Sequence, residues 1–198
     1  PHDNRLGIDG EDLPNMFGSN AFVGWYNGHP DFKNLNPNLD IKAAVIIGVG
    51  NVALDVARVL AKTSAEMSVT DLVGYAADAA HSSPVTDIHM LGRRGPVEAA
   101  FTNVELREMG ELENAAPVMT PDHLPGKIVA DYMSDRDLRL REKNIETMRS
   151  FLDVSPDGKN KRVHFGFFTS PIEILGQNRV EGLRVERTTV DANGKVHG

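Results

Sequence analysis

The stretch AAVIIGVGNVALDVARVLAK, residues 43–62, decides the fold of this chain. It opens with a continuous apolar run at residues 43–47, which is typical of a strand buried on both faces. The run ends at Gly48, and from Asn51 onward the apolar residues recur with the period of an α-helix. The stretch therefore predicts a strand, a tight turn and a helix in immediate succession.

The turn carries the spacing G-x-G-x-x-A at Gly48, Gly50 and Ala53, which in this context is the fingerprint of a dinucleotide-binding loop. The first glycine permits the turn, the second lets a pyrophosphate approach the backbone, and the small third residue lets the helix pack on the strand. The backbone N–H groups of Val49 to Val52 would then face the anion, assisted by the helix dipole. The alternative is a strand–helix corner that needs glycines only for its shape.

The composition limits the classes of function. The chain has 198 residues, of which 40% are hydrophobic, enough for one core. Its net charge of −7 argues against a nucleic-acid partner, and no apolar run approaches the length of a membrane span. Cysteine is absent, which excludes disulfides, thiolate metal sites and iron–sulfur ligation within these residues. This absence is compatible with a reducing compartment, and we expect a cytoplasmic location.

The rest of the chain alternates strand-like and helix-like patterns. Residues 1–40, rich in Gly, Pro, Asn and Asp, are typical of a connecting loop with at most a short strand or helical turn. The pattern predicts further strands at 88–91, 163–168 and 180–190 and helices at 72–80, 96–109 and 134–152. It also predicts a broken loop at 117–126 and turns at 170–171 and 176–178. This order predicts an α/β fold with a parallel core.

The end of the second predicted strand indicates which dinucleotide binds. An NAD site would place a carboxylate at this strand end, about 20 residues after the glycines. Asp71 is near that distance but lies before the strand, whereas Arg93 and Arg94 lie at its end. Two guanidinium groups suit a dianionic 2′-phosphate, which arginine grips with charge-assisted hydrogen bonds. We therefore predict NADP(H) as the cofactor; the alternative is an exposed basic pair that binds nothing.

Other signs of chemistry are weak. The seven histidines show no HxxH or HExxH spacing, so we expect no metal site. No GxSxG sequence marks a nucleophile elbow. We expect the aromatic cluster Phe165, Phe167 and Phe168 to belong to the core. The pattern alone thus predicts a binding domain and identifies no catalytic residue.

Five longer motifs resemble the NADP-binding domain of adrenodoxin-reductase-type ferredoxin–NADP reductases. They follow one another along nearly the whole chain: FVGWYNGHPD (22–31), GVGNVALDVARVL (48–60), LGRRGP (91–96), AFTNVELREM (100–109) and FFTSP (167–171). The resemblance implies a Rossmann-like parallel sheet flanked by helices, with a C-terminal β-meander, as in flavoproteins that bind two dinucleotides. It also implies that residues 1–40 are a crossover from an FAD domain. Residues 41–198 would then be the NADP-binding domain, truncated before the chain returns to the FAD domain.

The resemblance also implies roles for particular residues. In this family the loop matching Val49 to Val52 holds the pyrophosphate and the pair matching Arg93 and Arg94 holds the 2′-phosphate. The carboxylate matching Glu105 lies near the ribose or the nicotinamide. The whole enzyme would pass a hydride from NADPH to FAD, then single electrons to a ferredoxin or a similar small carrier. This part alone would bind and orient the nicotinamide without being active.

Two alternatives share the predicted loop. Another NADPH-dependent flavoprotein, such as the small subunit of a glutamate synthase, would have the same architecture and carry Cys-rich cluster motifs elsewhere. A non-enzymatic NADP(H)-sensing module would bind the nucleotide without reducing a flavin. A thioredoxin reductase is disfavoured, because the CxxC of that family lies in its NADP domain and this chain has no cysteine.

Overall fold

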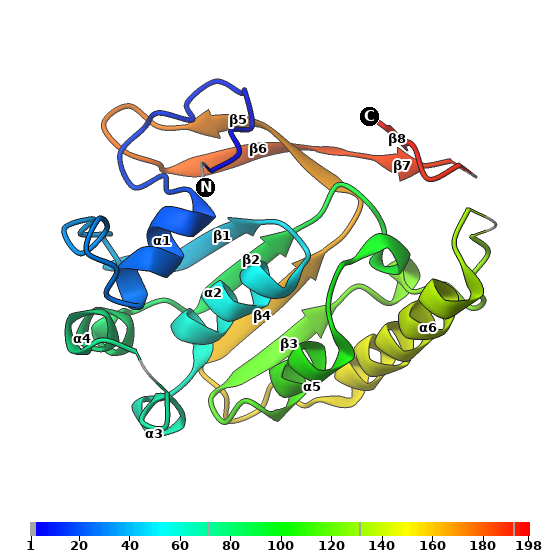
Figure 1. Cartoon of the computed structure of the whole chain (residues 1–198), viewed down its shortest axis with the longest axis horizontal. Helices are drawn as coiled ribbons and strands as arrows, with labels where there is room; N and C mark the ends of the chain where they lie inside the picture. The colour runs from blue at the N-terminus through cyan, green and yellow to red at the C-terminus, as the bar shows by residue number, and fades with distance from the viewer. Residues whose placement is uncertain (1–2, 71, 131, 192) are drawn as a thin grey trace.

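The computed structural model describes residues 3–70, 72–130, 132–191 and 193–198. A four-stranded parallel sheet lies at its centre, with the strand order β1-β2-β4-β3 (Figure 1). The strands of this sheet are β1 Ala43–Ile47, β2 Asp87–Leu91, β3 Ala115–Met119 and β4 Lys161–Gly166. The predicted α/β fold with a parallel core is confirmed.

Helices α2, α5 and α6 lie over one face of this sheet (Figure 1). The helices are α1 Ser19–Tyr26, α2 Asn51–Ala61, α3 Ser64–Met67, α4 Gly74–Ser82, α5 Asn103–Glu111 and α6 Asp135–Ser150. Under them, Ile88 and Met90 of β2, Val163 of β4 and Leu54 of α2 are completely buried. Burial of such side chains is the main term that stabilises a packed layer of this kind. Among the described residues, no helix has both the length and the apolar character needed to cross a bilayer.

The predicted starts of two helices are confirmed. Helix α2 begins at Asn51, directly after the glycine turn, and α6 begins after Ser134. The Ser134 hydroxyl accepts the backbone N–H of Asp137 at 3.2 Å, which caps the first turn of α6. The start of α6 depends on a contact across three positions, and the start of α2 follows directly after a glycine turn, so a local pattern is enough to predict both.

The helix predicted at residues 96–109 is wrong in its first half. Pro96–Glu98 forms only a 3₁₀ turn, and helix α5 does not begin until Asn103. Between them the chain runs beside the glycine turn, where the N–H of Ala100 donates to the carbonyl of Val49 at 2.8 Å. This pairing with a distant segment keeps residues 99–102 extended, which a helical pattern in the sequence does not show.

The broken loop predicted at residues 117–126 is also wrong at its start, because Ala115–Met119 forms strand β3. Pro117 suggested a loop, but β3 is at the edge of the sheet and, among the described residues, pairs only with β4. An edge strand tolerates a proline whose missing N–H would point away from its single neighbour.

The remaining strands form antiparallel pairs beside the parallel sheet. Strand β5, Thr169–Leu175, pairs with β6, Gly182–Arg187, and β7, Thr189–Val190, pairs with β8, Val196–His197. Pro171 lies inside β5 at a register shift, where a proline is tolerated, so the turn predicted at residues 170–171 is wrong. The N-terminal segment runs alongside β5 through a bridge between Asp9 and Glu173 (Figure 1).

Candidate functional site

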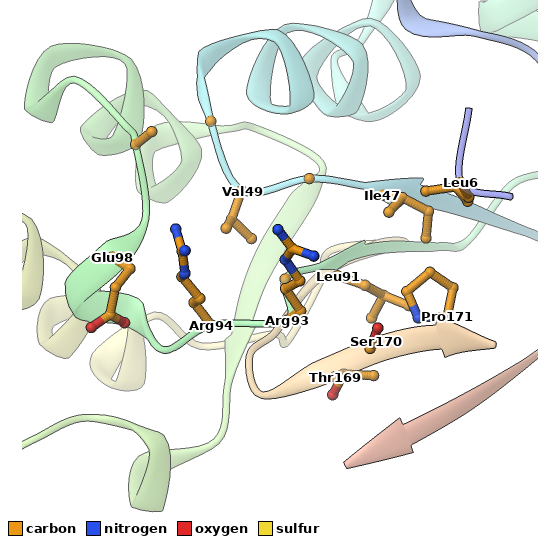
Figure 2. A pocket seen from close by; sticks show the side chains of 14 residues that line it. Leu6, Ile47, Val49, Leu91, Arg93, Arg94, Glu98, Thr169, Ser170 and Pro171 are labelled. Atoms are coloured by element: carbon orange, nitrogen blue, oxygen red, sulfur yellow. The ribbon is translucent and has the colours of Figure 1, made fainter. Parts of the chain in front are cut away.

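A pocket of about 450 Å³ opens at the carboxyl ends of β1 and β2. Its walls are the glycine turn, the segment after β2, and the start of β5 (Figure 2). The residues that line it are Leu6, Ile47, Gly48, Val49, Gly50, Leu91, Gly92, Arg93, Arg94, Glu98, Ala100, Thr169, Ser170 and Pro171. Ligands of open α/β sheets bind at this end of the strands. Five of the eight site residues predicted from the sequence, Gly48, Val49, Gly50, Arg93 and Arg94, therefore meet in one pocket.

The glycine turn is held against the end of β2. Gly48 has a φ of +143°, which is accessible to glycine and strained for other residues. Its N–H donates to the carbonyl of Leu91 at 2.8 Å. The Val49 side chain lies so close to Gly92 that an added Cβ there would be 2.7 Å from a Val49 methyl. The turn therefore needs glycine both in its own backbone and in the strand end that faces it.

Helix α2 presents its N-terminus at this turn. Gly50 is the N-cap residue in an extended conformation, and no side chain caps it. The Asn51 side-chain oxygen accepts the N–H of Thr102 at 2.8 Å, so this side chain joins the turn to the start of α5. Val52 follows in the first turn and is half exposed. The first N–H groups of the helix thus lack a capping side chain, and such a helix start favours an anion.

Arg93 and Arg94 extend from the end of β2 toward the glycine turn (Figure 2). In the part of the chain that the structure describes, neither guanidinium forms an ion pair. Glu98 lies on the far side of Arg94 and accepts a hydrogen bond from the Tyr132 hydroxyl at 2.5 Å. The pocket thus offers two guanidinium groups beside an uncapped helix start, which is a site for a multiply charged anion.

The backbone of the arginine pair is fixed by distant residues. The Thr188 hydroxyl donates to the carbonyl of Arg93 at 2.6 Å. The N–H of Phe168 donates to the carbonyl of Arg94 at 3.1 Å, and the carbonyl of Phe168 accepts the N–H of Thr188 at 3.0 Å. Phe168 has a φ of +52°, an uncommon conformation for a residue with a bulky side chain. Sequence reasoning missed Thr188 and assigned Phe168 only to the core, because no local pattern links either residue to the arginines.

Glu105 lies on α5 and forms an ion pair with Arg58 of α2. Arg58 is 14% exposed and also contacts Asp55 and Glu108, so its guanidinium joins three carboxylates between the two helices. Glu105 is not among the residues that line the pocket. Its expected place near the ribose or nicotinamide, which came from the resemblance alone, stays a prediction. Asp71, the alternative carboxylate for an NAD site, lies outside the described residues.

Comparisons with known proteins agree on one group. No protein-family model matches the chain. NADPH-ferredoxin reductase FprA of Mycobacterium tuberculosis is 39% identical over 196 residues, which are 98% of this chain and 42% of that protein. The mitochondrial NADPH:adrenodoxin oxidoreductase of Arabidopsis thaliana is 35% identical over 201 residues, covering 97% of this chain and 41% of that protein.

A solved structure agrees with these relatives. Mycobacterium tuberculosis FprA in complex with NADPH matches 98% of this chain and 43% of that chain, with a TM-score of 0.88 and 38% identity. The chain thus spans about two-fifths of the length of these relatives. Over that span, both its sequence and its fold make it a homologue of the adrenodoxin-reductase-type ferredoxin–NADP reductases, as its motifs predict.

Proposed function

We propose that this chain is the NADP(H)-binding part of an NADPH-dependent flavoprotein oxidoreductase of the ferredoxin–NADP reductase type. One observation carries the proposal: the glycine turn and the Arg93–Arg94 pair, which are 43 positions apart in the sequence, line the same pocket. A glycine turn alone would fit any dinucleotide. The two guanidinium groups beside it favour one that carries an additional phosphate.

In this proposal each wall of the pocket binds one part of the nucleotide. The pyrophosphate lies at the start of α2, where the N–H groups from Val49 to Val52 and the helix dipole favour negative charge. Arg93 and Arg94 bind the 2′-phosphate with charge-assisted hydrogen bonds. Two observations fit this assignment: α2 has no capping side chain, and neither guanidinium has a carboxylate partner among the described residues. When bound, NADPH supplies a hydride, and the residues of this chain hold and orient it.

The rest of the proposal concerns the longer protein. Its relatives carry the names NADPH-ferredoxin reductase and NADPH:adrenodoxin oxidoreductase. We infer that the whole protein contains FAD, which accepts the hydride and passes electrons singly to a ferredoxin or a similar carrier. Residues 1–40 would be the crossover from the FAD domain and residues 41–198 the NADP domain. A cytoplasmic location also stays a proposal, and the plant relative is named as mitochondrial.

The direct test is a titration of the chain with NADPH and, separately, with NADH, followed by nucleotide fluorescence. We expect NADPH to bind at least about tenfold more tightly, since one hydrogen bond to a charged group contributes about 1.5–3 kcal/mol. Equal affinities would show that the arginines do not bind the 2′-phosphate. Failure to bind either nucleotide would show that the glycine turn is only a corner between two packed elements.

Thr188 offers a test of how the arginines are positioned. Replacing Thr188 by valine keeps the shape of the side chain but removes the hydroxyl that donates to the carbonyl of Arg93. A lost hydrogen bond of this kind costs about 0.5–1.5 kcal/mol, so NADPH binding should weaken about twofold to tenfold. NADH binding should hardly change, and Thr188→Ser, which keeps the donor, should restore most of the NADPH affinity. If both nucleotides weaken equally, or serine behaves like valine, Thr188 does not act through the arginine pair.

A further inference from the structure

The second face of the parallel sheet carries a group of polar residues that the nucleotide pocket does not use. Side chains alternate along a strand, so Ile88 and Met90 of β2 point toward the helices while Asp87 and His89 point to the other face. His164 of β4 is the direct neighbour of His89 across the sheet. The pairing of the two strands thus brings Asp87, His89 and His164 together on one face.

The three side chains are in mutual contact. The imidazole rings of His89 and His164 are stacked, with centroids 4.4 Å apart and an angle of 11° between their planes. The Nε2 atom of His164 is 2.8 Å from Oδ1 of Asp87. One nitrogen or oxygen from each residue lies within 4.8 Å of the others. None of the three lines the nucleotide pocket.

Solvent reaches this face. The side chains of His164 and Asp87 are 29% and 42% exposed. In the same cross-strand row as the histidines lie Val45 of β1 and Val118 of β3, which are also exposed. The cluster is thus half-buried, so that an ion can enter and keep a water molecule as an additional ligand.

We propose that Asp87, His89 and His164 form a binding site for a divalent transition-metal ion such as Zn²⁺. Two imidazole nitrogens and one carboxylate oxygen are a donor set that suits such ions, whereas Mg²⁺ and Ca²⁺ prefer oxygen ligands alone. Two ligands at positions i and i+2 of one strand, with a third directly across on the next, converge on one point above the sheet.

A neighbouring residue orients one of these ligands. Both oxygens of the Asp87 carboxylate already have a contact, and Oδ1 faces Nε2 of His164. The other carboxylate oxygen, Oδ2, accepts the Thr86 hydroxyl at 2.7 Å. Such a second contact orients a ligand and tunes its metal affinity.

Metal binding requires a small rearrangement. Bonds of about 2.0–2.2 Å to a tetrahedral ion place the ligand atoms roughly 3.3–3.6 Å from one another. The rings must therefore turn out of their stack, and the metal must replace the proton between His164 and Asp87. Rotation about side-chain bonds is sufficient for this, because the strands already hold the three Cα positions.

The histidine spacing in the sequence predicts no metal site, and our proposal differs from that expectation because its ligands come from two strands. HxxH and HExxH patterns detect ligands on one helix, whereas His89 and His164 are brought together by strand pairing across 75 positions. An Asp-x-His pattern within one strand is too common to indicate a metal by itself.

The test is a calorimetric titration of the chain with Zn²⁺ in a buffer that does not bind metal. We expect one Zn²⁺ per chain and a rise in the melting temperature on saturation. The His89→Gln/His164→Gln double variant should bind at least about a hundredfold more weakly, since even residues that only orient a ligand contribute tenfold to a hundredfold. Asp87→Asn keeps the side-chain shape and should weaken binding as well.

The chain supplies a matched control. His197 and Asp191 also form a histidine–aspartate contact, with Nε2 of His197 2.9 Å from Oδ2 of Asp191, but among the described residues they have no third ligand. His197→Gln should therefore leave Zn²⁺ binding unchanged, and Mg²⁺ should not replace Zn²⁺. Circular dichroism serves to check that each variant is folded. The proposal is overturned if the parent does not bind Zn²⁺ at millimolar concentration. It is equally overturned if the folded double variant binds as tightly as the parent.

Discussion

Replacing Arg93 or Arg94 by alanine is expected to weaken NADPH binding about tenfold to a hundredfold while leaving NADH binding nearly unchanged. A hydrogen bond to a charged group contributes about 1.5–3 kcal/mol, and about 1.4 kcal/mol is a tenfold change in affinity. Both side chains extend into the pocket beside the glycine turn (Figure 2). The measurement is calorimetric titration of both nucleotides into the parent and each variant.

The double variant tests whether the two arginines act on one group. If both contact the same 2′-phosphate, the Arg93→Ala/Arg94→Ala chain should lose most of its preference for NADPH. The combined loss should be smaller than the sum of the two single losses, because interactions within one cluster are not additive. Added salt should weaken NADPH binding to the parent more than to the double variant, since exposed charge pairs are screened.

Arg139→Ala serves as the control, because Arg139 is an exposed residue of α6 outside the pocket. It removes the same charge from the chain and should leave both affinities unchanged. An equal fall in NADPH and NADH affinity for the Arg93 and Arg94 variants would contradict the assignment. The arginines would then act on the shared pyrophosphate or on folding.

The sequence predicts well those parts of the fold whose causes are local. The apolar run of β1, the glycine turn and the start of α2 lie within a few residues of one another, and all three occur where the pattern places them. The expected burial of β1 on both faces is wrong, because Val45 is exposed. The cap of α6 by Ser134 is likewise a contact across three positions. Such features depend on backbone conformation and nearby side chains, which a short stretch of sequence contains.

The elements that were predicted wrongly depend on partners far away in the sequence. Pro117 and Pro171 are typical of loops, yet each lies in a strand that tolerates it because of its position in a sheet. Residues 99–102 are extended because Ala100 pairs with Val49. In each case a tertiary contact overrides a local preference, and the contact becomes visible only when the strand order is known.

In the candidate site, too, some residues can be predicted from local motifs and others cannot. The glycine turn and the arginine pair are short motifs, so the sequence indicates both and the fold brings them together in one pocket. Thr188 is 95 positions from Arg93, and no motif marks the hydrogen bond that joins them. The residues that orient the arginines, like the histidines on the far face of the sheet, could be identified only from the structure.

Replacing Gly50 by valine is expected to abolish binding of both NADPH and NADH while leaving the chain folded. Gly50 has a φ of −139°, which any residue can adopt, and a Cβ added there would lie 3.8 Å from the nearest atom, the Cβ of Ala100. The protein itself therefore has room for a side chain. Valine is a poor N-cap residue, and its cost in stability should be only about 1 kcal/mol. In the complex, however, its methyl groups would lie where the pyrophosphate must approach the backbone.

A series at this position separates the loss of binding from the loss of fold. Gly50→Ala should weaken both nucleotides less than valine does, because it adds one methyl group rather than a branched side chain. Gly74→Ala is the control: an added Cβ there meets nothing within 4 Å, and Gly74 is not in the pocket lining. Gly48 is not a suitable position for this test. Its φ of +143° would strain any other residue, so a loss of nucleotide binding could not be separated from a loss of stability. If the folded Gly50→Val chain binds NADPH as tightly as the parent, the pyrophosphate does not bind at this turn. The glycines would then only allow the tight turn between β1 and α2.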